Sequence, residues 1–402
     1  MNQLYDENQL VTLLLCSHLA LDKEQNKTTK VLSLKEWNDL VLKLQDSKWK
    51  EPSALFNKTP SELVTNLNIN ANVAGRIELL LRRSVSLALE LEKLHGTGIY
   101  MIFRKDYPPY FRKALGTKAP PFFYIAGNIE NIYRSGIAVV GSRNVDEQGI
   151  LSTQKLAQQA VQEGLSIISG GARGVDITAQ EAALDSGGYV VSILHSALAS
   201  TMKKKNVREA ILAGKLTLLS AVPPNSRFYA SNAMNRNKYV YTLSRATFVI
   251  SCDSGTGGTW AGAVENLKNS WVPLFVRVSG DAPSGNINFV KEFKGHPLLQ
   301  EFHLDNSISL QQQIKQVLKQ FNSGNISYDA YNLVFPIIKE LILSNDKITI
   351  KKLADFLNLE DQQAKIWYER AIQDMHLPFS NDIHQNSLPK TINTFTQSSL
   401  FE

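Results

Sequence analysis

The sequence Gly136-Ile137-Ala138-Val139-Val140-Gly141-Ser142-Arg143 decides the fold. In it, a short run of β-branched and small apolar residues leads directly into a glycine-containing turn. Comparable runs, separated by segments of helical length, together occupy residues 137–140, 165–168, 189–194, 216–219, 247–251 and 272–278. Short apolar strands that alternate with helices are typical of a parallel sheet covered on both faces. The sequence therefore predicts an α/β fold, with a Rossmann-like doubly wound parallel sheet at residues 136–300.

The region before this core, residues 1–95, has the pattern of a small helical domain. Its apolar stripe at helical spacing consists of Ile77, Leu80, Leu81, Leu87, Ala88 and Leu91. Arg76, Arg82 and Arg83 fall outside the stripe. We expect these arginines to form a solvated helix face, with a DNA contact as the alternative.

Three further segments complete the predicted organisation. Residues 96–135 are a connector and the start of the core, because two pairs of prolines interrupt any long helix there. Residues 331–378 contain a helix at 351–358 and a second helix with the apolar face Ala364, Trp367, Tyr368, Ala371, Ile372 and Met375. This pair predicts a winged-helix-like domain, with a plain helical packing unit as the alternative. Residues 379–402 are polar and aperiodic, which predicts a disordered tail.

Composition limits the classes of function. The 402 residues are 43% hydrophobic and 20% charged, and no stretch approaches the roughly 20 apolar residues that span a bilayer. The N-terminus lacks the pattern of a secretion signal, so we expect a cytoplasmic protein without a membrane partner. Cys16 and Cys252 are too far apart in sequence to indicate a zinc cluster or a disulfide framework, and no metal or cofactor is expected. The net charge of +6 permits a polyanionic partner but is weak support by itself.

The residues that follow each predicted strand are the candidate site, because ligands of open parallel sheets bind beyond the carboxyl ends of the strands. Gly141, Ser142 and Arg143 follow the first strand and offer a close backbone approach, a hydroxyl and a guanidinium for phosphate. The second strand leads into the loop Ser169-Gly170-Gly171-Ala172-Arg173-Gly174, whose backbone N–H groups can turn toward an anion. Either loop alone is equally well explained as a glycine turn that packs a helix on the sheet. Two such loops on neighbouring strands favour an anion site.

Two further segments add cations, amides and aromatic rings. Asn235-Arg236-Asn237-Lys238 is interleaved with Tyr239 and Tyr241, an arrangement in which basic groups track phosphates and rings stack on bases. A solvated helix whose tyrosines bury their rings is the alternative. Gly257, Gly258 and Thr259 form another phosphate-type loop, and Glu265 follows in the next helix.

Other charged or titratable groups receive a structural interpretation. We expect Asp176 to cap a helix or to orient Arg173, since a lone carboxylate is a poor general acid or base. The run Lys203-Lys204-Lys205 is interpreted as a solvated surface. His195 is expected to be a hydrogen-bonded residue at a strand end, because no serine–acid or cysteine partner accompanies it.

Taken in order, these motifs resemble the DNA-processing protein A family, also called Smf. Residues 139–143 are similar to the family's opening motif, and residues 169–176 with Ala179 and Ala182 are similar to its second. Pro223-Pro224 and residues 236–244 are similar to its third.

The resemblance covers residues 107–285 and extends more weakly outward, to a helical N-terminal unit of SAM or helix-hairpin-helix type and a winged-helix C-terminal unit. Four departures predict a divergent member. Gln180 stands in place of the family's usual histidine, Lys238 replaces an arginine, extra residues separate Phe228 from Arg236, and the loop at residues 257–260 differs.

The resemblance implies a protein without catalysis of its own that binds single-stranded DNA, protects it, and helps to load a RecA-type recombinase in natural transformation, competence or recombination. Arg143, Arg173, Arg236 and Lys238 would contact phosphates, and a homodimer is expected. Two alternatives remain open. One is a nucleoside monophosphate phosphoribohydrolase that uses Glu265, and the other is a nucleotide sensor with the same loops.

Overall fold

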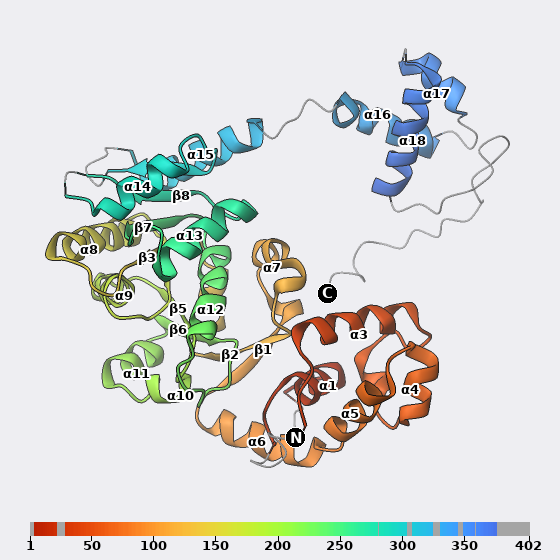
Figure 1. Ribbon diagram of the computed structural model, residues 1–402, viewed down its shortest axis with the longest axis horizontal. Coiled ribbons are helices and arrows are strands. Elements are labelled where there is room, and N and C mark those ends of the chain that lie inside the picture. Colours follow the sequence, from red (N-terminus) through yellow and green to blue (C-terminus); the bar gives the residue numbers. More distant parts are fainter. Residues whose placement is uncertain are drawn as a thin grey trace. The chain divides into compact units, whose positions relative to one another are not determined.

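A computed structural model of the chain describes residues 4–21, 29–279, 281–303, 308–324, 330–344, 349–357 and 359–375. The chain divides into two compact units, residues 1–318 and residues 319–402 (Figure 1). The domain boundaries drawn from the sequence stay predictions. The predicted disordered tail, residues 379–402, lies outside the described residues.

The described part of the first unit contains one mixed sheet with the strand order β1-β2-β6-β5-β4-β3-β7-β8-β9. The strands are β1 (Tyr100–Phe103), β2 (Phe122–Ala126), β3 (Gly136–Gly141), β4 (Ser166–Ser169), β5 (Val190–Leu194), β6 (Leu216–Ser220), β7 (Thr247–Ser251), β8 (Leu274–Arg277) and β9 (Leu299–Phe302). Strands β3 to β9 are parallel to their neighbours, whereas β2 pairs antiparallel with β6 and with β1. The predicted α/β fold with a doubly wound parallel sheet is therefore confirmed.

Helices cover both faces of this sheet, which is why its central strands are almost entirely buried. Figure 1 shows α8 and α9 on one side of the sheet and α12 and α13 on the other, and α8 packs against α9 as α12 packs against α13. The helices of this region are α7 (Pro109–Leu115), α8 (Glu147–Gln162), α9 (Val175–Asp185), α10 (Leu198–Thr201), α11 (Lys205–Leu212), α12 (Ala230–Leu243), α13 (Gly257–Asn269), α14 (Ser284–Glu292) and α15 (Leu310–Gly324). Short 3-10 helices occupy Arg104–Asp106, Gly116–Lys118 and Ile129–Tyr133. Within the described ranges, no helix is both long enough and apolar enough to cross a lipid bilayer.

The strand order fixes where a ligand can bind. From β3 the chain proceeds outward in one direction through β4, β5 and β6, and then returns to the other side of β3 with β7, β8 and β9. Loops leaving the carboxyl ends of β3 and β7 therefore diverge to opposite sides and open a crevice between them.

The connector predicted at residues 96–135 contributes more to the sheet than its sequence indicated. It supplies β1 and β2, which extend the sheet beyond β6, and the prolines bound α7 between them. These two strands and β9 were missed because they lie at or next to the edges of the sheet, outside the regular alternation of strands and helices. Tertiary pairing, which a local pattern does not reveal, holds such strands in place.

The N-terminal helices of the first unit enclose their own apolar core. They are α1 (Glu7–Cys16), α3 (Leu34–Asp46), a 3-10 helix (Pro52–Leu55), α4 (Pro60–Leu67), α5 (Ala71–Leu81) and α6 (Ser84–Gly96). The core includes Leu13, Leu14, Leu40, Leu44, Leu63, Ile77, Leu80 and Leu87. The apolar stripe predicted from the sequence is thus shared by α5 and α6, and Ala88 lies at the surface.

The described part of the second unit contains the helices α16 (Ala330–Ser344), α17 (Ile350–Leu357) and α18 (Asp361–Asp374). A small core joins them, formed by Ile338, Ile342, Leu353, Ala371 and Ile372. The winged-helix assignment stays a prediction.

Arg83 contradicts the interpretation of the three N-terminal arginines as a solvated face. Arg82 is exposed and pairs with Glu78, and Arg76 pairs with Glu36. Arg83, in contrast, is only 8% exposed and donates hydrogen bonds to the carbonyl oxygens of Leu14, Leu19 and Leu80. It therefore donates to the Leu14 carbonyl in the last turn of α1, where the helix itself supplies no donor, and it ties this turn to Leu80 at the end of α5.

We predict that Arg83→Ala lowers the free energy of unfolding by about 2 to 4 kcal/mol, because three carbonyls, two of them in buried hydrogen bonds, lose a charged donor. Arg82→Ala, which removes an exposed ion pair one residue away, should change it by less than about 1 kcal/mol. Urea unfolding of the two variants measures the difference, and equal effects would show that Arg83 is not a structural anchor.

Candidate functional site

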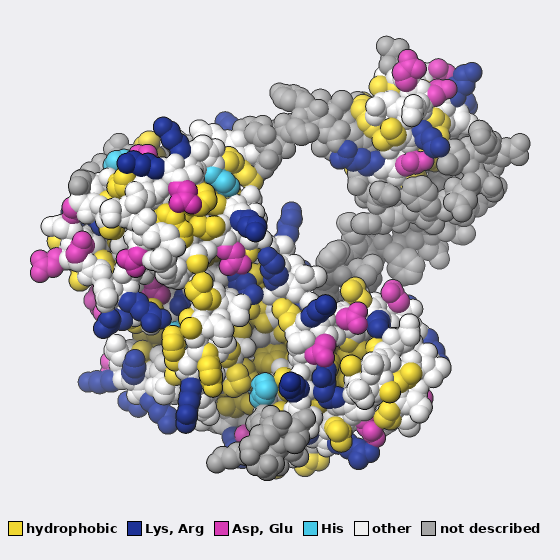
Figure 2. Space-filling model, in the orientation of Figure 1, with side chains coloured by type: hydrophobic (Ala, Val, Ile, Leu, Met, Phe, Trp, Pro, Cys, Tyr) yellow, Lys and Arg dark blue, Asp and Glu magenta, His cyan; other side chains and the backbone are white. Residues whose placement is uncertain are grey.

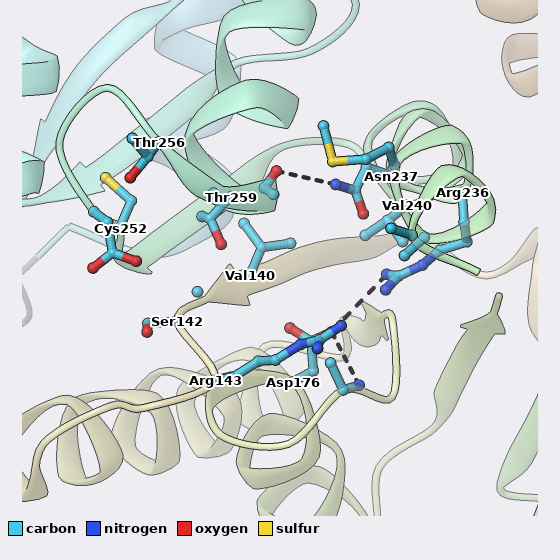
Figure 3. A pocket seen from close by; sticks show the side chains of 18 of the residues that line it. Val140, Ser142, Arg143, Asp176, Arg236, Asn237, Val240, Cys252, Thr256 and Thr259 are labelled. Atoms are coloured by element: carbon cyan, nitrogen blue, oxygen red, sulfur yellow. Dashed lines mark hydrogen bonds and ion pairs between the residues drawn. The ribbon is translucent and has the colours of Figure 1, made fainter. Parts of the chain in front are cut away.

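A cavity of about 410 Å³ lies at the crevice between β3 and β7 (Figure 3). Four segments line it: the loop after β3, the loop after β4, the approach to α12 with α12 itself, and the loop after β7 with the first turn of α13. Segments distant in sequence thus meet at the carboxyl ends of β3 and β7, where the strand order reverses.

Many of the predicted site residues line this cavity. They are Gly141, Ser142, Arg143, Ala172, Arg236, Asn237, Gly257, Gly258 and Thr259. The remaining predicted residues lie outside its lining, and these are Ser169, Gly170, Gly171, Arg173, Gly174, Asn235 and Lys238. The structure brings the four loops together, while the DNA-binding role of the individual residues stays a prediction.

Several predicted residues outside the lining have structural contacts. The Ser169 hydroxyl donates to the Val139 carbonyl at 2.9 Å, which joins β4 to β3. Arg173 is exposed and donates to the side-chain oxygen of Asn144 at 2.6 Å. Lys238 is half-buried, and this burial lowers the pKa of its amine while the charge of Glu265 opposes the shift.

The glycine loop after β4 binds an anion that belongs to the chain itself. The backbone N–H groups of Gly170 and Ala172 donate to Oδ2 of Asp176, at 3.1 and 3.3 Å. The Nη1 atom of Arg236 lies 3.9 Å from the same oxygen. Asp176 neither orients Arg173 nor occupies the N-cap position, which is held by Gly174, so that interpretation was wrong.

The Arg236 side chain lies directly over Gly170, the first glycine of this loop. A side chain at residue 170 would collide with the Arg236 guanidinium, so only glycine leaves room for it. Arg236 is 7% exposed and Asp176 is 6% exposed. Burial raises the pKa of the Asp176 carboxyl and lowers that of Arg236, while the attraction between the two groups opposes both shifts. Arg236 is therefore a buried, paired cation at the wall of the cavity.

Arg143 provides the exposed cation of the cavity. It extends from the loop after β3, and its guanidinium carbon lies 5.6 Å from the centre of the Phe228 ring. Figure 3 shows Arg143 reaching toward the Asp176–Arg236 ion pair from the side opposite α12. The Ser142 hydroxyl accepts a hydrogen bond from the Asn144 amide at 3.2 Å, which helps to fix this loop.

One face of α12 was missed in the sequence. Residues spaced three or four apart along this helix line the cavity: Ala230, Ala233, Met234, Asn237, Val240 and Tyr241. That helical spacing could have identified the face, had the motif not been interpreted by its charges alone. The Tyr241 hydroxyl is buried and, within the described ranges, has no hydrogen-bond partner.

The first turn of α13 forms the opposite wall. Nδ2 of Asn237 donates to the Gly258 carbonyl at 3.0 Å and ties α12 to α13 (Figure 3). In the part of the chain that the structure describes, no side chain caps this N-terminus, where Thr256 is the N-cap residue. Its backbone amides therefore remain available to a ligand. The described residues contain no group of three or more histidine, cysteine or acidic side chains that could hold a metal ion.

The part of the chain that builds this site matches a known family. Residues 98–292 match the family described as DNA recombination-mediator protein A. The DNA processing protein DprA of Streptococcus pneumoniae is 29% identical over 140 residues, 35% of this chain and 49% of that protein. Protein Smf of Synechocystis is 30% identical over 144 residues, 34% of this chain and 36% of that protein. The matched segment thus spans half or less of these curated relatives.

A solved structure is also similar. The X-ray structure of DNA processing protein A from Streptococcus pneumoniae matches with a TM-score of 0.52 at 20% sequence identity. The match covers 74% of this chain and 95% of that one. At this identity, the likeness shows a shared fold.

His195 generates a prediction about acid stability. Its burial and the positive charges of Arg236 and Arg143 lower the pKa of the imidazole from 6.5 to about 4. The unfolded chain therefore takes up a proton on this residue as the pH falls from 6.5 toward 4, whereas the folded chain does not, and stability is lost across that window. Because the ring is half-buried, we expect solvent screening to limit the loss to about 1 to 2 kcal/mol.

Urea unfolding at about pH 7 and about pH 4.5, for the wild type and His195→Gln, measures this contribution. The wild type should lose more stability between the two pH values than the variant. An identical loss in both proteins would show that His195 does not resist protonation.

Proposed function

We propose that the chain, whose residues 98–292 match the DNA recombination-mediator protein A family, is a divergent member of that family. It binds single-stranded DNA along the carboxyl edge of its sheet and has no catalysis of its own. The sugar-phosphate chain crosses the cavity between β3 and β7. Phosphates contact Arg143, the Ser142 hydroxyl and the amides of the first turn of α13.

The observation that carries this proposal is the position of Arg143. It is an exposed guanidinium at the wall of a cavity whose other wall is the uncapped first turn of a 13-residue helix. A cation and a helix N-terminus that face one crevice favour an anionic ligand. A ligand with consecutive phosphates can contact both walls at once.

Aromatic and basic groups at the border of the cavity and beyond it support a strand longer than one nucleotide. Phe228, which lines the cavity, and its neighbour Tyr229 are exposed, in a position for bases to stack on their rings. Figure 2 shows lysine and arginine side chains over α10 and α11, where Lys203-Lys204-Lys205 and Arg208 are exposed. The loop that carries Phe228 is hydrogen-bonded to the start of α10, because the Ala197 and Ala199 amides donate to its carbonyl oxygens. A strand leaving the cavity over Phe228 would approach these cations.

Further parts of the proposal come from the family. We propose that the protein protects single-stranded DNA in the cytoplasm, helps to load a RecA-type recombinase during natural transformation or recombination, and acts as a homodimer. In this proposal the winged-helix-like domain at residues 331–378 follows a DNA-binding core at residues 136–300, with the helical domain at residues 1–95.

The hydrolase alternative has less support from the geometry. Glu265 lies two turns into α13 and is not among the described residues that line the cavity. Its charge instead acts on Lys238. A carboxylate that attacks or activates a group at the ribose must reach the bound nucleotide.

We predict that Arg143→Ala reduces the salt dependence of oligodeoxythymidylate binding. Loss of one phosphate contact should reduce the magnitude of the slope of log K against log salt concentration by about 0.7 for a single strand. Fluorescence anisotropy at several salt concentrations measures the slope. The matched control is Lys268→Ala, which removes an exposed cation from the last turn of the same helix α13, away from the cavity, and should leave the slope unchanged. Equal slopes in both variants would contradict the proposed site.

We also predict that Glu265→Gln leaves DNA binding within about twofold of the wild type, since this partly buried side chain is not among the described residues that line the cavity. Chromatographic assay of nucleoside monophosphates should detect no free base with either protein. Release of base by the wild type and not by Glu265→Gln would establish the hydrolase instead.

A further inference from the structure

The loop after β4 has hydrogen-bond donors arranged as in a phosphate site, and a side-chain oxygen of Asp176 already accepts from them. Two backbone N–H groups, from Gly170 and Ala172, converge on Oδ2 of Asp176, and the Arg236 guanidinium faces the same atom. Converging amides with a cation behind them are the usual donors to a phosphate oxygen. Here the acceptor is a carboxylate of the same chain.

The geometry is not that of a helix cap. A capping side chain stands before the helix and accepts from amides inside it. Asp176 is instead the second residue of α9, and its carboxylate turns back to accept from amides of the loop that precedes the helix. It thus fills the concave side of the loop, where an external anion would otherwise bind.

Burial separates this ion pair from solvent. Asp176 and Arg236 are both more than nine-tenths buried, so the charge of Arg236 is balanced within the fold. Gly170 lets the guanidinium lie against the loop, as described above. Arg143 differs, since it is exposed and its nearest ring partner, Phe228, carries no charge.

We propose that Asp176 acts as an internal substitute for phosphate: it occupies the anion cradle of the loop after β4, positions Arg236, and thereby directs DNA phosphates to Arg143 and the first turn of α13. The first part concerns the protein alone, and the second rests on the proposed function. Asp176 is then a specificity-determining residue that limits how many phosphates the site contacts.

Chemical rescue tests the first part without DNA. Asp176→Ala empties the cradle and leaves Arg236 without its partner, so we expect the Tm to fall by about 5 to 15 °C. Sodium formate, which restores a free carboxylate, should raise the Tm of this variant by mass action at constant ionic strength. Inorganic phosphate should do the same, whereas chloride should not.

The matched control is Asp253→Ala, which removes an exposed carboxylate from the lining of the same cavity. Neither this variant nor the wild type should be stabilised by formate more than by chloride. An equal response to formate in all three proteins overturns the proposal. If Asp176→Ala does not fold, refolding it in formate must yield folded protein, and failure to do so also overturns the proposal.

DNA binding tests the second part with the isosteric variant Asp176→Asn. Neutralising the internal anion frees Arg236 to bind one more phosphate, so the slope of log K against log salt should steepen by about 0.7 and affinity at low salt should rise. Weaker binding with an unchanged slope would indicate a structural role only and overturn this part. If neither the wild type nor the variants bind DNA, while formate still raises the Tm of Asp176→Ala, the proposed function is wrong. The proposal that Asp176 occupies the anion cradle is then still supported.

Discussion

The reversal of strand order between β3 and β7 is the constraint on which the site depends. Seven parallel strands direct their carboxyl ends to one edge, and only at the reversal do consecutive loops separate instead of packing together. Residues of α12 form one wall of the cavity there, and the first turn of α13 forms the other. The chemistry of the site follows from which groups the loops hold fixed and which they leave exposed.

Two arginines at this edge have different roles because their surroundings differ. Arg236 is buried against Gly170 and paired with Asp176, so the carboxylate of the same chain largely balances its charge. Arg143 is exposed at the mouth of the same cavity. A buried pair contributes rigidity and shape more than attraction for a polyanion, whereas an exposed guanidinium can exchange its counterions for phosphate.

Local pattern and motif order were sufficient to predict the α/β core, six of its strands and the family that residues 98–292 match. They were insufficient wherever a residue's role depends on a distant partner. The edge strands β1 and β9, and β2 beside β1, are held by pairing. Arg83 is buried with its hydrogen bonds to carbonyl oxygens of α1 and α5, and the partner of Asp176 lies 60 residues away at Arg236. A charged residue in a sequence shows its chemistry, but not whether its charge faces solvent or the interior.

The most direct test of the account is a crystal structure of the protein with a short oligodeoxythymidylate. The account predicts a phosphate within hydrogen-bonding distance of the Arg143 guanidinium, a neighbouring phosphate at the first turn of α13, and Asp176 still bound to the amides of Gly170 and Ala172. A phosphate seated on the amides of the loop after β4, or a strand bound away from the cavity, would contradict it.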